Sequence, residues 1–376
     1  MRIVDVRTRQ LFCPFKETIH DSARAVSGRD VLLIEIVTDN GLTGLGFLTG
    51  LGVAHGSEIG VINVIITQSL RPMLLGQDPR DYNRLWEVMY LGTTRFGRKG
   101  AAVRAISGVD IALWDLIGKA ANMSVHQLLG GYADKVKVYA SGGFYTQRND
   151  VGELVDEMLG YVAQGFKAVK MKVGRDVRFD ANRVGAVRKA LGDDIDLLVD
   201  ANEAWDSSTA LRFIQRVAEY DLYWLEEPVA PDDINGYARL AAAGGISIAA
   251  GENEYARYGF RDLIQNQAVH VVQPDVTRVG GISEWIKVAN MAAAWNMTCA
   301  THAVQEVHIS LSAAVSNAPL MEYFSPDHYL QTFLSKLFVE PRELRELRDG
   351  YIHVPKTPGL GLVIDTELAE HYTRLP

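Results

Sequence analysis

The sequence predicts an α/β protein, a (β/α)7β-type TIM barrel with an N-terminal α+β capping domain that the C-terminal tail completes. Short apolar runs alternate with amphipathic helical patterns from residue 136 to residue 323, which is typical of successive βα units. Seven or eight such units in series favour a barrel over an open sheet. The residues before them show strands first and helices after, which indicates a separate α+β module.

The N-terminal module opens with a meander. Strand patterns occupy residues 2–12, 30–38 and 42–48, and the turn Asp-Asn-Gly precedes the third. Two polar or Gly-rich loops, 16–24 and 49–57, are long enough to be either solvated surface or lids over a site. Helical periodicity follows at 59–70, 81–90 and 101–121. Ser107, Asp110 and Trp114 interrupt the apolar face of the last helix.

The barrel strands are expected where apolar runs end in polar residues. These runs are 136–140, 168–173, 195–199, 222–225, 247–250, 270–272, 297–300 and 320–323, with helical patterns between them. An open doubly wound sheet is the main alternative, but the Gly-rich phosphate-binding turn that its first strand would need is missing. We therefore predict three parts: a cap at 1–130, the barrel at 131–336, and a segment at 337–376 that returns to the cap.

Composition restricts the partners of the protein. The formal net charge is −8, and no basic run is interleaved with aromatic residues, so we expect neither nucleic acid nor membrane as a partner. Two cysteines, Cys13 and Cys299, lie far apart in sequence, which favours free thiols and a reduced, cytoplasmic location. The charged N-terminus is unlike a signal peptide, and no apolar run is long enough to span a bilayer.

Acidic residues end three successive strand patterns. Asp200, Glu226 and Glu252 are spaced by 26 residues each time, which is one βα unit. Because the carboxyl ends of barrel strands open onto one face, we expect these side chains to converge there. Their mutual repulsion calls for a cation, and hard oxygen ligands suit Mg²⁺ best, with Mn²⁺ possible. Any one of these acids alone could instead cap the helix that follows it.

Basic residues are expected at the same face. Lys170 and Lys172 alternate on one short strand and so point the same way, and like-charge repulsion should lower the pKa of at least one of them. The alternative is an edge strand with two solvated lysines. Asp275 and His302 follow neighbouring strands and are expected to pair, the carboxylate orienting the imidazole and raising its basicity. Glu322 ends the last strand.

These pieces, in this order, resemble the enolase superfamily and within it the mandelate racemase subgroup. The matching motifs are Lys-x-Lys, Val-Asp-Ala-Asn, Trp-Leu-Glu-Glu-Pro, Gly-Glu-Asn, Gln-Pro-Asp followed by Arg-Val-Gly-Gly-Ile, Thr-His-Ala, and Leu-Met-Glu. The resemblance covers the whole chain. It implies abstraction of the proton α to a substrate carboxylate, through an enediolate that Mg²⁺ stabilises. It also implies a homo-oligomer.

The resemblance assigns roles to the expected site residues. Asp200, Glu226 and Glu252 would hold Mg²⁺ against the substrate carboxylate, with Lys170 adding positive charge there. Glu322, if protonated or held by a partner, would donate a hydrogen bond to that carboxylate. Lys172 and the His302–Asp275 pair would approach the substrate carbon from opposite sides. Asn202 and Glu227 would orient ligands or substrate.

The same machinery supports two outcomes. Protonation of the same carbon makes a racemase or epimerase, whereas loss of a β-hydroxyl makes a dehydratase that forms a 2-keto-3-deoxy acid. The polar loop residues His20, Asp21, Arg24 and His55 suit a polyhydroxylated acid, so we favour an acid-sugar dehydratase acting on an aldonate or aldarate. The segment 95–101 is similar to that of the galactarate/talarate dehydratase branch.

Two other functions are weighed and disfavoured. A metal-binding barrel without catalysis leaves no reason for both Lys172 and His302 to be present. A cycloisomerase of the muconate type would carry a lysine in the region of His302.

Overall fold

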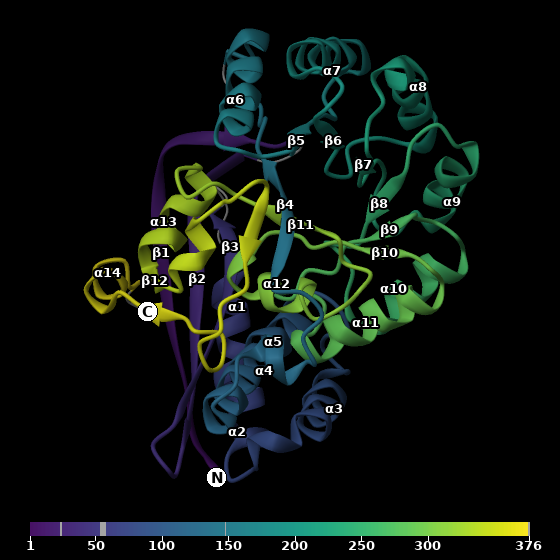
Figure 1. Ribbon diagram of the computed structural model, residues 1–376. Helices are drawn as coiled ribbons and strands as arrows, with labels where there is room; N and C mark the ends of the chain where they lie inside the picture. The colour runs from purple at the N-terminus through teal and green to yellow at the C-terminus, as the bar shows by residue number, and fades with distance from the viewer. Residues whose placement is uncertain (23–24, 53–57, 147, 375–376) are drawn as a thin grey trace.

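The computed structural model describes residues 1–22, 25–52, 58–146 and 148–374. Figure 1 shows barrel helices in an arc around the barrel strands. The N-terminal strands and helices, in purple and blue, lie along one side of this barrel, and the yellow C-terminal segment lies against them. The predicted architecture, a barrel with an N-terminal cap that the tail completes, is confirmed.

The cap sheet is antiparallel and has the order β1-β2-β3, formed by β1 (Ile3–His20), β2 (Ala25–Thr38) and β3 (Thr43–Gly52). Helix α4 (Ala101–Ala121) packs on it very closely. A Cβ at Gly46 would lie 2.3 Å from the carbonyl oxygen of Gly108, so only glycine permits this approach. The close packing fixes the sheet relative to the first turn of α4, which faces the barrel mouth.

The predicted loop at 16–24 is wrong over most of its length. Residues 16–20 are the end of β1, and after a register shift Ile19 and His20 pair with Val26 and Ala25 of β2. Inter-strand hydrogen bonds outweigh the polar composition of this stretch, which had indicated a loop. Likewise β3 continues to Gly52, so the second predicted loop is shorter at its start. Residues 23–24 and 53–57 lie outside the described parts of the chain.

The remaining cap elements are short helices. They are α1 (Ile59–Val64), the π-helical η1 (Ile65–Leu70), α2 (Arg71–Leu74), η2 (Pro79–Asp81), α3 (Tyr82–Thr93) and α5 (Val125–Leu128). Apolar side chains of α1, η1, α2 and α3 form a core with β1–β3 and α4, whereas Val125 of α5 belongs to the larger core that includes the barrel. In the described residues no single helix has the length and apolar composition of a membrane span; one sharply bent pair, Ile59–Leu74 with Pro79–Thr93, passes that test only jointly.

The barrel strands overlap the predicted runs. They are β4 (Lys135–Ser141), β5 (Ala168–Lys172), β6 (Asp196–Asp200), β7 (Leu225–Glu226), β8 (Ile248–Ala250), β9 (Val271–Val272), β10 (Thr298–Cys299) and β11 (Leu320–Tyr323). Their order is β10-β9-β8-β7-β6-β5-β4-β11, and neighbours are parallel. Across the remaining gap, the backbone N–H of Glu322 donates to Thr301 Oγ1 at 3.2 Å.

Helices follow each of these strands. They are α6 (Val151–Ala163), α7 (Val177–Leu191), α8 (Ser207–Val217) with η3 (Ala218–Tyr220), α9 (Ile234–Ala243), α10 (Ala256–Gln265), α11 (Ile282–Ala294), α12 (Gln305–Ser312) and α13 (Tyr329–Leu337). Inside the barrel, one layer of the core comprises Tyr139, Ala168, Leu198, Trp224, Ala249, Val271, Ala300 and Leu320. This layer forms the floor beneath the barrel mouth.

A set of buried hydrogen bonds joins the cap to the barrel. Asp110 of α4 accepts from the backbone N–H of Ser283 at 2.9 Å and from its hydroxyl at 2.7 Å. The same hydroxyl accepts from Trp114 Nε1 at 2.9 Å, and Ser107 accepts from the N–H of Gly280. The polar residues that interrupt α4 are therefore its barrel contact. Gly281 is the N-cap residue of α11, and Ser283 lies within the first turn of that helix.

The tail contacts both cap and barrel. Arg374 donates its backbone N–H to Gln10 of β1, and Leu360 donates to Asp115 of α4. Strand β12 (Phe338–Glu340) pairs with β14 (Val363–Ile364), whereas β13 (Tyr351–His353) pairs with barrel strand β4. The elements η4 (Arg342–Arg345) and α14 (Thr366–His371) complete the segment. The boundaries at 130 and 336 stay predictions.

Candidate active site

The site residues lie two positions along the chain beyond the residues of the core layer, toward the barrel mouth. Strand side chains alternate, so a residue two positions after an inward one also points inward. Lys170 follows Ala168 in this way, and Asp200 follows Leu198. The same step places Glu226, His302 and Glu322 above Trp224, Ala300 and Leu320. The period of the strand thus brings these charged groups into the barrel mouth.

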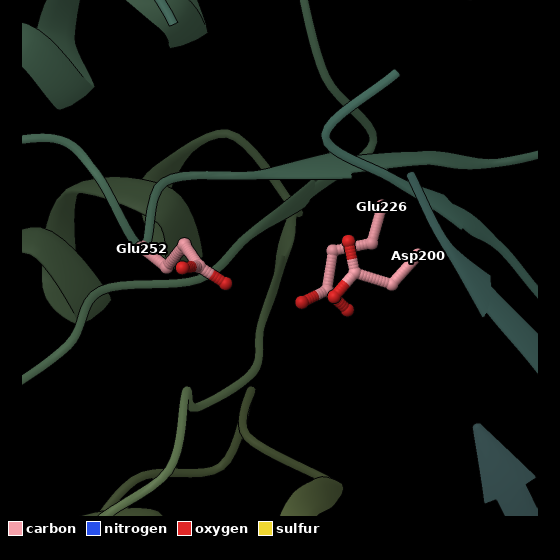
Figure 2. A group of neighbouring side chains, drawn as sticks. All are labelled: Asp200, Glu226 and Glu252. Atoms are coloured by element: carbon pink, nitrogen blue, oxygen red, sulfur yellow. The ribbon is translucent and has the colours of Figure 1, made fainter. Parts of the chain in front are cut away.

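The three acids predicted as metal ligands lie together and are buried. One carboxylate oxygen from each of Asp200, Glu226 and Glu252 can be chosen so that all lie within 4.8 Å of one another. Figure 2 shows Asp200 and Glu226 side by side, with Glu252 reaching toward them from a neighbouring segment. The convergence expected from their spacing is present.

This donor set fits a hard divalent cation. Mg²⁺ prefers carboxylate oxygens as ligands. The three acids offer one such oxygen each, within 4.8 Å of one another, so they would hold the ion together. Oε2 of Glu252 is buried and accepts no hydrogen bond from a described residue, although His302 Nε2 lies 3.2 Å from it. Glu252 thus has an oxygen available for such a ligand.

Both lysines of β5 are buried and held by carboxylates. Lys170 Nζ lies 2.8 Å from Glu226 Oε1 and 2.8 Å from Glu322 Oε1, and Lys172 donates to Asp200. Burial alone would lower the pKa of Lys170, but Glu226 and Glu322 outweigh it and hold that pKa well above its usual value. Burial and the nearby Lys170 would lower the pKa of Lys172, but Asp200 together with Glu226 and Glu252 raises it above its usual value.

The predicted lowering of a lysine pKa is therefore wrong for the protein without its cation. The predicted repulsion between the two ammonium groups exists, but it is smaller than their attraction to the acids. The lysines are not on a solvated edge strand either, because β5 lies between β4 and β6.

Glu322 is a carboxylate that accepts hydrogen bonds. Its Oε2 accepts from the backbone N–H of Ala303 at 2.6 Å, and Oε1 faces Lys170. Burial would raise the pKa of Glu322, yet Lys170 and His302 outweigh it and lower that pKa below its usual range. The expectation of a protonated, donating Glu322 is not met here, although Lys170 does hold the carboxylate.

His302 and Asp275 are paired as their positions on neighbouring strands predict. His302 Nδ1 lies 2.8 Å from Asp275 Oδ2, and the hydroxyl and N–H of Thr277 both hold Asp275 Oδ1 at 2.7 Å. Burial would lower the pKa of His302, but Glu252 and Asp275 together raise it. Nε2 of His302 is left to face the barrel mouth beside Glu252.

Lys172 and His302 line one cavity of about 380 Å³ between cap and barrel. Lys172 comes from β5, whereas His302 follows β10. These strands are separated by β6 to β9 in one direction and by β4 and β11 in the other. The two groups therefore face the cavity from different sides of the barrel mouth, with Glu252 and Glu322 also in its lining.

Family profiles match both parts of the chain. The profile described as "Mandelate racemase / muconate lactonizing enzyme, N-terminal domain" matches residues 3–130, and "Enolase C-terminal domain-like" matches residues 153–368. The chain belongs to the mandelate racemase/muconate lactonizing enzyme group of the enolase superfamily. The family predicted from the strand-end motifs is confirmed.

Characterised members of this group resemble the chain over nearly its whole length. Arabinonate dehydratase of Saccharolobus solfataricus is 35% identical, covering 98% of this chain and 99% of the relative. The 3,6-anhydro-alpha-L-galactonate cycloisomerase of Streptomyces coelicolor is also 35% identical, covering 96% and 97%. The crystal structure of L-talarate dehydratase from Polaromonas sp. JS666 with Mg and L-glucarate has a TM-score of 0.87 at 34% identity, covering 100% and 98%.

The predicted substrate-binding residues of this family member divide into three groups. Asp21 and Asn202 line the cavity. His20 is not among its lining residues, and instead forms a β-bridge with Tyr145. Arg24 and His55 lie outside the described residues.

The two predicted supporting residues both contact other acids or amides. Asn202 donates to both carboxylate oxygens of Asp200, at 2.9 Å from the backbone and 3.2 Å from the side chain. Glu227 accepts from Asn253 at 2.9 Å, and burial raises the pKa of Glu227 well above its usual value. His270 and His308 serve the fold. Each accepts a backbone N–H, from Ile248 and Val276 respectively.

Several cavity residues were not predicted from the sequence. Arg29 of β2, Arg104 of α4 and Phe144 line the cavity, as does Arg278. Arg278 lies within a motif already singled out, and its position three residues after Asp275 could have drawn attention to it. Arg29 and Arg104 carry no such signal, because one arginine in a strand and one in a helix are ordinary surface residues until the fold brings them together.

Proposed function

We propose that this protein is a Mg²⁺-dependent dehydratase of acid sugars, which converts a polyhydroxylated carboxylic acid into a 2-keto-3-deoxy acid and water. The observation that carries the proposal is the placement of two proton carriers, Lys172 and His302, on different sides of one cavity beside a cluster of three acids. Dehydratases among the similar proteins support the choice of reaction.

Asp200, Glu226 and Glu252 would hold the cation. When bound there, Mg²⁺ supplies positive charge next to the substrate carboxylate, on which negative charge develops as the α-proton leaves. Lys170 adds a second positive charge at this place, since its ammonium is buried and held by Glu226 and Glu322. A preorganised charge in a buried site stabilises the transition state strongly because it needs no reorganisation.

Lys172 would remove the α-proton from one face. Asp200 is the main charge that raises the pKa of Lys172, and burial opposes it. Engagement of Asp200 by a cation therefore lowers that pKa and favours the neutral amine that a base requires. Phe144 covers the ammonium at 5.0 Å from its ring centroid, which keeps water away from this side.

His302 would deliver a proton to the leaving β-hydroxyl from the other side. Asp275 fixes the imidazole through Nδ1, so Nε2 is the nitrogen that faces the substrate. The electron pair of the broken C–H bond forms the new C–C double bond as the C–O bond breaks and water departs. The resulting enol takes up a proton at C3 and becomes the keto acid, so the net change is loss of one water.

A screen of acid sugars tests this proposal. The protein is incubated with Mg²⁺ and a panel of aldonates and aldarates, and keto acid formation is measured beside optical rotation. We expect keto acid from at least one compound, with loss of the activity in EDTA and recovery on adding Mg²⁺. A change of rotation without keto acid would identify a racemase or epimerase. A product isomeric with the substrate and lacking the keto group would identify a cycloisomerase, and both results contradict the proposal.

A further inference from the structure

The cations that line the cavity differ in whether a carboxylate lies within ion-pair distance of them. Arg104 is paired with Glu58, and Arg278 Nη1 lies 3.2 Å from Glu252 Oε1. Lys172 is paired with Asp200. Arg29 has no such carboxylate within 4 Å among the described residues. It is therefore the one cation in the described lining of the cavity whose charge no nearby acid neutralises.

Arg29 is also poorly satisfied in its hydrogen bonds. Its side chain belongs to β2 at the cap wall of the cavity, and the residue is only 7% exposed. The Nε atom is buried and has no hydrogen-bond partner in the described parts of the chain. Burial lowers the pKa of Arg29 to about 10, so the group still carries its charge at neutral pH.

A buried cation without a partner is costly to the folded protein. Removing such a charge from water costs several kcal/mol unless an anion compensates for it. A guanidinium presents its donors in a planar fork that matches a carboxylate in two parallel hydrogen bonds. A ligand that brings a carboxylate to Arg29 would offset this cost and would gain binding free energy from it.

The reacting carboxylate of the substrate cannot be that group. It belongs beside Asp200, Glu226 and Lys170 at the barrel mouth, if the proposed function is right. Arg29 lies on the cap and lines the same cavity from the other side of the cap–barrel boundary. An anion at Arg29 must therefore be a second carboxylate at the far end of the substrate.

We infer that Arg29 binds the distal carboxylate of a dicarboxylic sugar acid, so that this enzyme selects aldarates over aldonates. This inference rests on the proposed function for the position of the reacting end. Overall similarity does not make the distinction, since the dehydratases compared above are named for an aldonate in one case and for a diacid in the other. Arg29, which has no carboxylate within 4 Å among the described residues, supports this distinction.

An internal alternative is that Arg29 serves only the fold. Glu306 is buried near it, and the charge of Glu306 opposes the fall in the pKa of Arg29. Glu306 Oε1 accepts from Gln331, while its Oε2 has no hydrogen-bond partner in the described residues. If the Arg29–Glu306 attraction were the purpose, removal of Arg29 would destabilise the protein and would not change its choice of ligand.

The test compares Arg29→Met with the wild type and with Arg9→Met. Arg9 is an exposed residue on the neighbouring strand β1, so its variant controls for the loss of one cap arginine. Galactarate against D-galactonate and D-glucarate against D-gluconate are two pairs that differ at the distal carboxylate. Each protein is assayed for keto acid formation and, by calorimetry with Mg²⁺ present, for binding of the same four compounds.

We expect the wild type and Arg9→Met to prefer the diacid of a pair. Arg29→Met should lose roughly 10- to 100-fold in kcat/KM or in affinity for the diacid, with the monoacid changed less than about threefold. Arg29→Lys should retain part of the preference because it keeps the charge. The melting temperature of Arg29→Met should be equal to or above that of the wild type, since an unpaired buried charge has been removed.

The outcomes separate this inference from the proposed function. Equal losses on diacid and monoacid, or a wild type that prefers monoacids, would overturn the role of Arg29 while keto acid formation upheld the dehydratase. If no compound yields keto acid, the dehydratase fails, and calorimetry still decides whether diacids bind through Arg29. A lower melting temperature with unchanged ligand preference would assign Arg29 to the fold.

Discussion

Ser283→Ala should weaken the hydrogen-bonded contact between cap and barrel. The hydroxyl of Ser283 donates to Asp110 at 2.7 Å and accepts from Trp114 Nε1 at 2.9 Å, and all three residues are buried. The substitution removes both bonds but keeps the one from the Ser283 backbone to Asp110. Each of the two buried groups left without this partner costs about 1–3 kcal/mol, so the expected loss is roughly 2–6 kcal/mol.

Thermal unfolding measures this loss. An unfolding entropy of about 2.1 cal/mol/K per residue over 376 residues converts roughly 2–6 kcal/mol into a fall in melting temperature of about 3–8 °C. Ser208→Ala, at an exposed position in α8, is the matched control and should change stability by less than about 0.5 kcal/mol. Equal melting temperatures for the two variants would refute the reasoning, because the contact would then not depend on this hydroxyl.

Three further predictions concern the cation, the proton carriers and pH. Mg²⁺ at about 100 times its dissociation constant should stabilise the wild type by about 2.7 kcal/mol, as measured by unfolding, and Glu226→Gln should abolish this gain. In deuterated water with Mg²⁺, His302→Asn should form no keto acid yet still exchange the substrate α-proton, whereas Lys172→Ala should do neither; full turnover by the Lys172 variant would refute its role as base. Burial raises the pKa of Asp110 from 3.8 to about 7, so the folded protein binds this proton more tightly than the unfolded chain, and the stability that Asp110 contributes at low pH is lost as pH rises from 3.8 to 7. Asp110→Asn should flatten that fall in unfolding free energy between pH 4 and 7, and an unchanged slope would contradict the assignment.

The alternation of strand side chains explains why much of the site was predictable. A run of apolar residues that ends in a charged one fixes both the strand and the direction of its last side chain. This rule alone predicts the positions of Asp200 and Glu226 at the barrel mouth. Glu252 follows Glu226 by the same spacing, which predicts that it ends the next strand. The order of strands in a barrel then makes the three acids neighbours. Nothing beyond local pattern and topology was needed.

The charge states of the site were less predictable because they depend on neighbours that are distant in sequence. Lys170 and Lys172 lie two residues apart on one strand and point to the same side, so their mutual repulsion could be predicted. The carboxylates that overrule it come from other strands: Glu226 lies 2.8 Å from Lys170, and Asp200 contacts Lys172. Glu322 was expected to donate a hydrogen bond if it were protonated or held by a partner. Lys170 lies 2.8 Å from it and lowers its pKa, so Glu322 is held as a carboxylate. The direction of a pKa shift can therefore be predicted only when the distances between the charged groups in the folded protein are known.

The cap residues were the least predictable, and one helix shows why they matter. Helix α4 presents Asp110 and Trp114 to Ser283 on the barrel, while Arg104 in its first turn lines the cavity. These hydrogen bonds between cap and barrel therefore fix the position of Arg104. The charge of Arg104 is neutralised by its ion pair with Glu58. Among the described residues that line the cavity, Arg29, on the sheet beneath α4, is the one cation without a carboxylate within 4 Å. The inferred selection of diacids depends on which arginine in the described lining of the cavity has no carboxylate beside it, and the sequence without its fold does not contain that information.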